Sequence, residues 1–338
     1  MKLNRIGLDL AKQVFQVHGV DSHEQVKCRK QLKRQQMLDF FRQLEPCLVV
    51  MEACGSAHYW ARELRVLGHE VRLIAPQFVK PYVKSGKNDA NDAEAICEAG
   101  SRPSMRYVEV KSAEQQANQS VHRIRSRVVR SRTALVNEVR GLLAEFGLVE
   151  PRTGVAAARE LLRQAIDTQD NGLPGPMREL LRDLSEELQG HDERLANLEK
   201  LLQRQAREDE RVKRLMKIEG IGPISATAVV SAVGDARQFR SGRQFAAWLG
   251  LVPSQHSSGG KERLGSISKR GDKYLRTLLV HGARAVLKHC QEKTDKRSDW
   301  LNKLLCRRNK NIATVALANK NARIIWAILS KGEQYQPG

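Results

Sequence analysis

The stretch that decides the fold is RIGLDLAKQVFQVHGV, residues 5–20. Its two apolar runs, on either side of Ala11 and Lys12, predict two short strands joined by a turn. Working outward, the pattern predicts a buried strand at 47–52 (CLVVME), a helix at about 57–67 with Ser56 as its N-cap, a strand in EVRLIAP at 70–76 that Pro76 ends, and a helix at about 89–99 with an Asp-rich first turn. Strands followed by alternating helix and strand predict an α/β domain over residues 1–112.

Acidic side chains occupy unusual places in these elements. Asp9 lies inside an apolar strand, where a charge is costly unless it is paired or metal-bound, and Glu52 closes a second apolar strand. Asp89 and Asp92 are three residues apart, so they share one helix face. Four converging carboxylates suit Mg²⁺ or Mn²⁺, and two such ions can clamp a phosphodiester. The spacing equally allows an exposed turn at Asp9 and ordinary helix-start acids at Asp89 and Asp92. The acids expected on the solvent face of the same helix are Glu94 and Glu98.

The middle of the chain, residues 113–216, has helical periodicity. Apolar residues recur every three or four positions from Ile124 to Phe146 and again from Leu181 to Leu202, and His191 interrupts the second series. Between the two series, TQDNGLPGPM at 168–177 has enough Gly and Pro to reverse the chain. The pattern predicts an antiparallel helical hairpin or a coiled coil shared between subunits.

The last part, residues 217–338, begins with a helix-hairpin-helix pattern. Ile218, Gly220, Ile221 and Gly222 give the turn, and the N–H groups of the next helix can hold a phosphate; a tight helix connection without a ligand is the alternative. A polar loop and two apolar helices, about 273–290 and 311–331, follow.

Charge is concentrated in this last part. The chain carries 58 Lys and Arg against 38 Asp and Glu, a net charge of +20. Residues 1–112 contribute +5, residues 113–217 contribute +2, and residues 218–338, with 21 basic and 8 acidic side chains, contribute +13. A surface so basic predicts binding to a polyanion, most simply nucleic acid.

A basic run on the first long helix is a second candidate nucleic-acid contact, since arginine forks bind phosphate and stack on bases. A solvated helix face is the alternative. The arginines of this run are Arg123, Arg125, Arg127, Arg130, Arg132 and Arg140.

The remaining composition excludes several classes of protein. Six scattered cysteines without a CxxC pair argue against a disulfide framework or a structural zinc site. Neither a signal peptide nor a membrane-spanning stretch is expected, which predicts a cytoplasmic protein.

Three motifs give a specific resemblance: IGLDLAK at 6–12, MEACG at 51–55 and KNDANDA at 87–93. They resemble the DEDD motifs of a bacterial insertion-sequence transposase family, the bridge-RNA-guided recombinases. The resemblance implies a RuvC-like domain of ribonuclease-H fold, then a coiled coil, then a mostly helical transposase domain. It implies DNA and a non-coding guide RNA as partners at the bacterial nucleoid, and Mg²⁺ or Mn²⁺ as cofactor. The family's quartet then falls on Asp9, Glu52, Asp89 and Asp92.

The polar loop SQHSSGGKER at 254–263 supplies hydroxyls, glycines and cations. By composition alone it is typical of a linker. The preceding GLVP at 250–253 resembles the segment before the family's catalytic serine, which implies Ser258 as nucleophile, with Ser257 as second choice. The cations expected to hold phosphate are Lys261, Arg263, Lys269 and Arg270.

Together these features predict a DNA transposase that cuts and rejoins strands through a phosphoserine, working as a dimer or tetramer. Two alternative functions are compatible with the same residues. One is a metal-dependent junction nuclease in which water attacks, and the other is a nucleic-acid-binding scaffold without catalysis.

Overall fold

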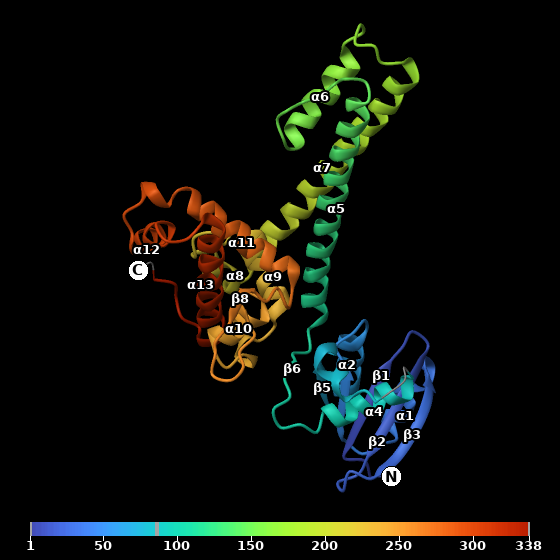
Figure 1. Cartoon of the computed structure of the whole chain (residues 1–338). Helices are drawn as coiled ribbons and strands as arrows, with labels where there is room; N and C mark the ends of the chain where they lie inside the picture. The colour runs from blue at the N-terminus through green and yellow to red at the C-terminus, as the bar shows by residue number, and fades with distance from the viewer. Residues whose placement is uncertain (1, 85–87, 337–338) are drawn as a thin grey trace. The chain divides into compact units, whose positions relative to one another are not determined.

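The computed structural model describes residues 2–84 and 88–336 (Figure 1). The chain forms two compact units. The first consists of Met1–Gln116 and Val233–Arg240, and the second of Ala117–Ala232 and Ser241–Gly338.

The first unit is built on a six-stranded mixed sheet in the order β3-β2-β1-β4-β5-β6. β1 pairs antiparallel with β2 and parallel with β4, β4 is parallel to β5, and the outer strands β3 and β6 are antiparallel to their neighbours. The strands are β1 Arg5–Leu10, β2 Val14–Val20, β3 Val26–Lys33, β4 Leu48–Glu52, β5 Glu70–Ile74 and β6 Tyr107–Val108. The α/β class predicted for this part is confirmed.

Helices cover both faces of the sheet because its central strands are apolar on both sides. Val49 and Met51 of β4 pack in one core with Trp60 and Leu64, whereas Val50 belongs to a separate core. That second core contains Ile74 and the helix residue Ile96. The helices of this unit are α1 Met37–Arg42, α2 Ala57–Val66, α3 Pro76–Val79 and α4 Asp89–Ala99, with 3₁₀ turns at Arg34–Gln36, Lys80–Tyr82 and Ala236–Gln238.

One detail of α2 differs from the prediction. Ser56 does occupy the N-cap position, but its φ is +69° and its side chain makes no capping hydrogen bond. The predicted capping role of Ser56 is therefore wrong, because a left-handed backbone at this position leaves the hydroxyl without the usual N-cap geometry.

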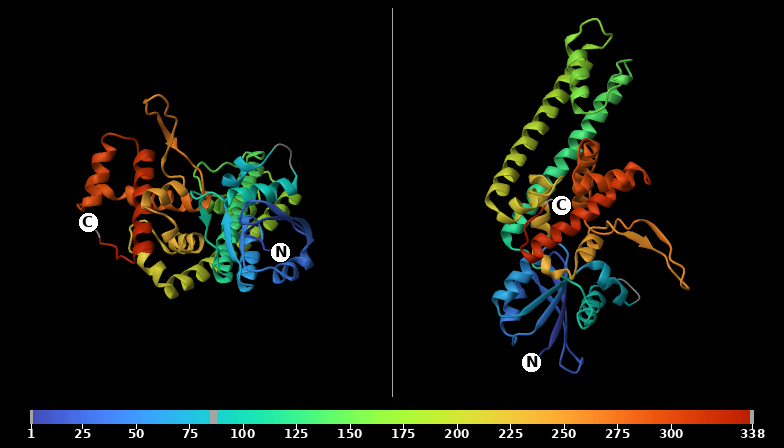
Figure 2. Two further views of the ribbon diagram at one scale, coloured as in Figure 1. Left: turned by 90° about the horizontal axis from the view of Figure 1, so that it is seen from below. Right: turned by 90° about the vertical axis from the view of Figure 1, so that its left-hand side faces the viewer.

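The second unit contains two long antiparallel helices, α5 Ala113–Ala144, whose first turn belongs to the first unit, and α7 Gly175–Glu208 (Figures 1 and 2). Their register is visible in ion pairs: Arg125 pairs with Glu199, and seven residues further along α5, Arg132 pairs with Asp192, seven residues earlier in α7. Leu135, Leu181 and Leu188 lie in the apolar core between them. The helical content predicted for 113–216 is present, together with a further helix, α6 Val155–Asp167.

The rest of the second unit is helical apart from one small hairpin. Its elements are α8 Glu210–Met216, α9 Pro223–Val233, α10 Gly242–Trp248, β7 Pro253–Gln255, β8 Leu264–Ile267, α11 Lys273–Lys288, a 3₁₀ turn at Cys290–Glu292, α12 Lys296–Leu305 and α13 Lys310–Lys331. Among the described residues α13 alone is long and apolar enough to cross a membrane, a feature that the sequence analysis did not anticipate. Here α13 packs on α10 and α11, with Leu317 and Ile325 fully buried.

Candidate active site

The site in the first unit depends on a close approach between β1 and α4. Gly7 of β1 lies directly under the helix, where a Cβ would come within 2.5 Å of the backbone nitrogen of Cys97. Arg5 fixes the same contact from below, since its Nε donates to the Cys97 carbonyl at 2.8 Å. The missing side chain therefore lets the first turn of α4 lie over the end of β1. Gly7 was not among the predicted site residues, although glycine inside an apolar strand is itself a signal of close backbone approach.

All four predicted carboxylates belong to this region. Leu8 and Met51 are partners in the parallel pairing of β1 and β4, so Asp9 and Glu52 follow at neighbouring strand ends. Asp89 and Asp92 occupy the first turn of α4, which Asn88 caps by accepting from the Ala90 N–H. Within the motif at 87–93, Lys87 is outside the described residues.

Electrostatics show that these acids act on one another. Burial and the charges of Asp92, Asp89 and Glu52, in that order, raise the pKa of Asp9 from 3.8 to about 6. Burial, followed by the charge of Asp92, raises the pKa of Glu52. No basic side chain is among the main influences on either carboxyl group. Among the described residues, the fold therefore concentrates negative charge around Asp9 and Glu52.

The donor set fits a hard divalent cation. Oxygen ligands from several carboxylates are what Mg²⁺ and Mn²⁺ take in proteins, and a cation would offset the repulsion around Asp9. In the part of the chain that the structure describes, no three His, Cys, Asp or Glu side chains already stand at a shared coordination distance. Asp92, Asp89 and Glu52 are thus close enough to raise the pKa of Asp9, although no complete set of metal ligands is formed among the described residues.

The two neighbouring acids of α4 are engaged elsewhere, as expected for its solvent face. Glu94 pairs with Lys84 and Arg29, and Glu98 pairs with Arg102 at 2.8 Å. These ion pairs compensate the charge of Glu94 and Glu98, whereas among the described residues the main influences on Asp9 are burial and other acids.

The predicted serine loop is a β-hairpin, β7–β8, and not an irregular linker (Figure 2). Gly259 and Gly260 form its tip with φ of +56° and +75°, a two-residue turn whose positive φ values glycine adopts without strain. The turn is closed by the Lys261 N–H, which donates to the Ser258 carbonyl at 3.1 Å. At the base, Asn319 donates to the Leu251 carbonyl at 3.0 Å. Ser258 therefore lies at the exposed tip of an anchored arm.

Cross-strand register separates the two candidate serines. Ser258 is paired with Lys261, and the His256 N–H donates to the Arg263 carbonyl at 2.9 Å. Paired residues share a face and successive pairs alternate, so Ser258 lies on a face with cationic neighbours. Ser257 lies on the opposite face, where its Oγ accepts from Gln255 at 3.0 Å and from the Arg263 N–H at 3.2 Å.

The other residues proposed to hold phosphate occupy different environments. Lys261, Arg263, Lys269 and Arg270 are exposed. Gly220 has a φ of +84° and faces α11, where a Cβ would lie 2.7 Å from the Gly282 carbonyl oxygen, whereas Gly222 is open to solvent. The glycine turn thus has a packing role at Gly220 that the sequence did not distinguish from phosphate binding.

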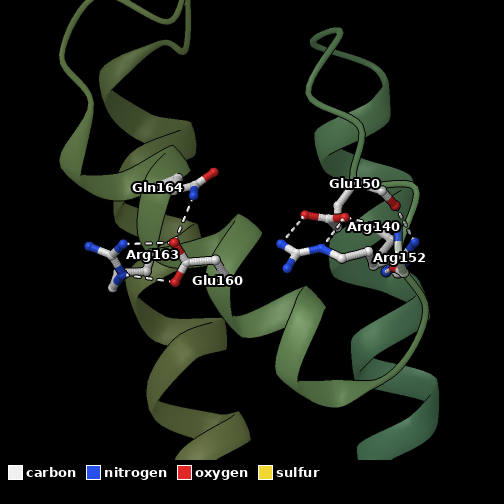
Figure 3. A network of polar contacts seen from close by, with 6 residues as sticks. All are labelled: Arg140, Glu150, Arg152, Glu160, Arg163 and Gln164. Atoms are coloured by element: carbon white, nitrogen blue, oxygen red, sulfur yellow. Dashed lines mark hydrogen bonds and ion pairs between the residues drawn. The ribbon is translucent and has the colours of Figure 1, made fainter.

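The arginines of α5 fall into two groups. Arg125 and Arg132 point to α7 and pair with Glu199 and Asp192. Arg140 donates to the carbonyl oxygens of Glu150 and Arg152 within the polar network of Figure 3. The exposed arginines, spaced by four and three residues on one side of the helix, are Arg123, Arg127 and Arg130.

Two family models match the chain. One, described as a transposase of the DEDD IS110 type, covers residues 6–147, and the other, described as the transposase IS116/IS110/IS902 family, covers residues 212–299. The first span includes the four carboxylates, and the second includes the serine hairpin.

Curated relatives agree over the whole length. The chain is 70% identical over 338 residues to a probable family 20 transposase of Pseudomonas aeruginosa, covering 100% of both chains. It is 49% identical to the transposase for insertion sequence element IS1111A of Coxiella burnetii, covering 98% of this chain and 91% of the relative. It is 42% identical to the transposase for insertion sequence element IS1328 of Yersinia enterocolitica, covering 97% of each. This chain belongs to the IS116/IS110/IS902 family of transposases.

Proposed function

We propose that this transposase cuts and rejoins the DNA strands of an insertion sequence through a covalent phosphoserine at Ser258, with Mg²⁺ or Mn²⁺ held by Asp9, Glu52, Asp89 and Asp92. The observation that carries the proposal is the negative charge that Asp92, Asp89 and Glu52 concentrate around Asp9, whose pKa is raised to about 6. Catalysis of phosphoryl transfer needs cations close to the reacting phosphate, and carboxylates without basic partners are suited to recruiting them.

In the proposed reaction, the Oγ of Ser258 forms a bond to phosphorus and the bond from phosphorus to one sugar oxygen breaks. The sugar oxygen leaves with the bonding electron pair and takes up a proton. Bound metal would stabilise charge on the phosphate oxygens and on the leaving oxygen. Rejoining reverses these steps, and the phosphoserine retains the bond energy needed for it.

The hairpin supports Ser258 over Ser257 as the nucleophile. The hydroxyl of Ser257 already accepts two hydrogen bonds within the hairpin. Ser258 is exposed and shares its face with Lys261 and Arg263, whose positive charges suit the approach of a phosphodiester.

Each of the three parts predicted from the sequence would have its own role in the reaction. Residues 1–112 would form the RuvC-like, ribonuclease-H-like domain, a proposal supported by the mixed sheet and the acids at the ends of β1 and β4. Residues 113–216 would act as a coiled coil that joins subunits into a dimer or tetramer. Residues 217–338 would be the transposase domain that carries the nucleophile.

A guide RNA is also part of the proposal. The exposed side of α5, with Arg123, Arg127 and Arg130, would contact its backbone, whereas Arg125 and Arg132 serve chiefly to hold α5 and α7 together. Base pairing by the RNA would then select the DNA, as in other guided systems. Sequencing the nucleic acid that co-purifies with the chain tests this part directly.

The serine chemistry is tested by trapping the protein–DNA adduct. The full chain, with its co-purifying nucleic acid and Mg²⁺, is incubated with a plasmid carrying the element's ends and then denatured. We expect an adduct for the wild-type chain and for Ser257→Ala, and none for Ser258→Ala. Strand cleavage without any adduct would support the metal-dependent nuclease, and loss of the adduct only in Ser257→Ala would move the nucleophile by one residue.

A further inference from the structure

We propose that His256 is the proton acceptor for Ser258 in the strand-cutting step. The inference rests on the proposed serine function and deepens it, because it names the group that makes the hydroxyl nucleophilic. The hairpin register places His256 and Ser258 on the same face. The sequence alone does not show that these two side chains share a face.

The register is fixed by three independent contacts. Gln255 is the partner of Leu264, the His256 N–H donates to the Arg263 carbonyl, and Ser258 is the partner of Lys261. These pairs follow one another without slippage from strand to turn. Alternation then puts His256, Ser258, Lys261 and Arg263 on one face and Gln255, Ser257 and Leu264 on the other.

Spacing brings the imidazole within reach of the hydroxyl. Two residues along a strand advance the chain by about 6.5 Å, and both side chains leave the same face. An imidazole can span most of that separation, which puts the hydroxyl within reach of a ring nitrogen once the side chains adopt suitable rotamers. Ser257, the alternative hydroxyl, faces away from His256.

The face also has the charge that the reaction needs. A serine hydroxyl is a poor nucleophile until a base removes its proton, and the ammonium of Lys261 and the guanidinium of Arg263 carry hydrogen-bond donors but no acceptor. The imidazole of His256 is the side chain on this face whose ring nitrogen can accept a proton. All four side chains are exposed, so DNA phosphate has access to the face.

The proposed step balances as follows. The Oγ–H proton of Ser258 moves to a ring nitrogen of His256 while the Oγ–P bond forms, giving an imidazolium. The P–O bond to the sugar breaks, and the sugar oxygen leaves with its electron pair and is protonated by solvent. On rejoining, the sugar hydroxyl gives up its proton to solvent, and the imidazolium returns a proton to the departing Ser258 oxygen.

The test measures the rate of adduct formation in the plasmid reaction described above. We expect His256→Ala and His256→Gln to slow it by about 100- to 1,000-fold, since glutamine keeps a polar side chain but cannot take the proton. Added imidazole should raise the rate of adduct formation by His256→Ala at least tenfold. Gln255→Ala, the next residue on the opposite face, is the matched control and should keep the wild-type rate with an unchanged DNA affinity.

Each result has one consequence. Wild-type rates in His256→Gln, or no rescue of His256→Ala by imidazole, overturn the role of His256 while an adduct that depends on Ser258 leaves the proposed function intact. An adduct that persists in Ser258→Ala overturns Ser258 as the nucleophile, and the absence of an adduct in the wild-type chain overturns the serine chemistry itself. A slow His256→Ala that imidazole restores supports proton transfer, because a purely structural loss would not respond to the free base.

Discussion

Asp9 is a residue whose ionisation should oppose folding. Its pKa in the folded chain, about 6, lies above the ordinary value of 3.8, so the fold binds the proton more tightly than the unfolded chain does. Above about pH 6 the group is ionised in both states, and burial next to three acids then destabilises the fold. Below about pH 4 it is protonated in both states and the penalty disappears.

We therefore predict that Asp9→Asn raises the free energy of unfolding at pH 8 by about 1 kcal/mol, after allowance for solvent screening, and changes it little at pH 4. Urea denaturation in the presence of a chelator measures both values. An equal gain at the two pH values would show that the effect of the substitution is not electrostatic.

With divalent metal, the wild-type chain should become more stable than Asp9→Asn. A ligand that binds only the folded chain stabilises it by about 2.7 kcal/mol at one hundred times its dissociation constant. Mg²⁺ or Mn²⁺ should therefore raise the melting temperature of the wild-type chain and have little effect on Asp9→Asn. Equal shifts in both proteins would count against Asp9 as a ligand, and Glu94→Gln, outside the quartet, should respond like the wild type.

At the scale of elements, the contact between β1 and α4 assembles the carboxylates. A methyl group on Gly7 would collide with the backbone of α4, which cannot yield as a flexible side chain can. We expect Gly7→Ala to cost about 1–3 kcal/mol of stability and to weaken the metal-induced stabilisation. Gly55→Ala is the control, since a Cβ there meets no atom within 4 Å. A Gly7→Ala chain with wild-type stability and metal response would contradict this role.

Substitutions in the two groups of arginines on α5 should have different effects on stability and on RNA binding. Arg125→Ala removes two hydrogen bonds to Glu199, at 3.0 and 2.6 Å, from a mostly buried position, and should cost about 1–2 kcal/mol. Arg127→Ala, on the exposed side, should leave stability unchanged within about 0.5 kcal/mol and weaken RNA binding. Thermal unfolding and filter binding with the co-purified RNA give the two readouts. Equal effects of the two variants in both assays would contradict the assignment of Arg125 to helix packing and of Arg127 to RNA binding.

Sequence patterns predicted the elements that bury an apolar stripe and missed those that do not. Apolar runs predicted β1, β4 and β5, the Asp-rich first turn predicted α4, and apolar residues at helical spacing predicted the long helices. β3 has no such pattern, because this edge strand, VKCRKQLK, buries only Leu32. In the site, Asp9 could be predicted because it is a charged residue inside an apolar strand. The role of Gly7 depends on close packing, and the two faces of the serine hairpin depend on cross-strand register. No local sequence pattern encodes either feature.

For the whole molecule, the distribution of charge makes a prediction about binding to DNA. The last 121 residues carry +13 of the net +20, and the exposed cations of the serine hairpin belong to them. Each phosphate contact releases condensed counterions, so log affinity should fall with log salt by about 0.9 per contact. A steep salt dependence is therefore expected for the full chain, and it should be carried mainly by this region.

Removing three cations from each region tests where the contacts lie. Replacing Lys261, Arg263 and Lys269 by alanine should reduce the salt slope by about 2 to 3, since each would lose one phosphate contact. The matched triple replacement in the first unit, of the exposed Lys2, Lys27 and Lys33, should leave the slope nearly unchanged. Fluorescence anisotropy with labelled duplex DNA, from low to moderate salt, measures both. Equal reductions would mean that net charge alone governs binding, and that the hairpin has no privileged contact with the phosphodiester it is proposed to cut.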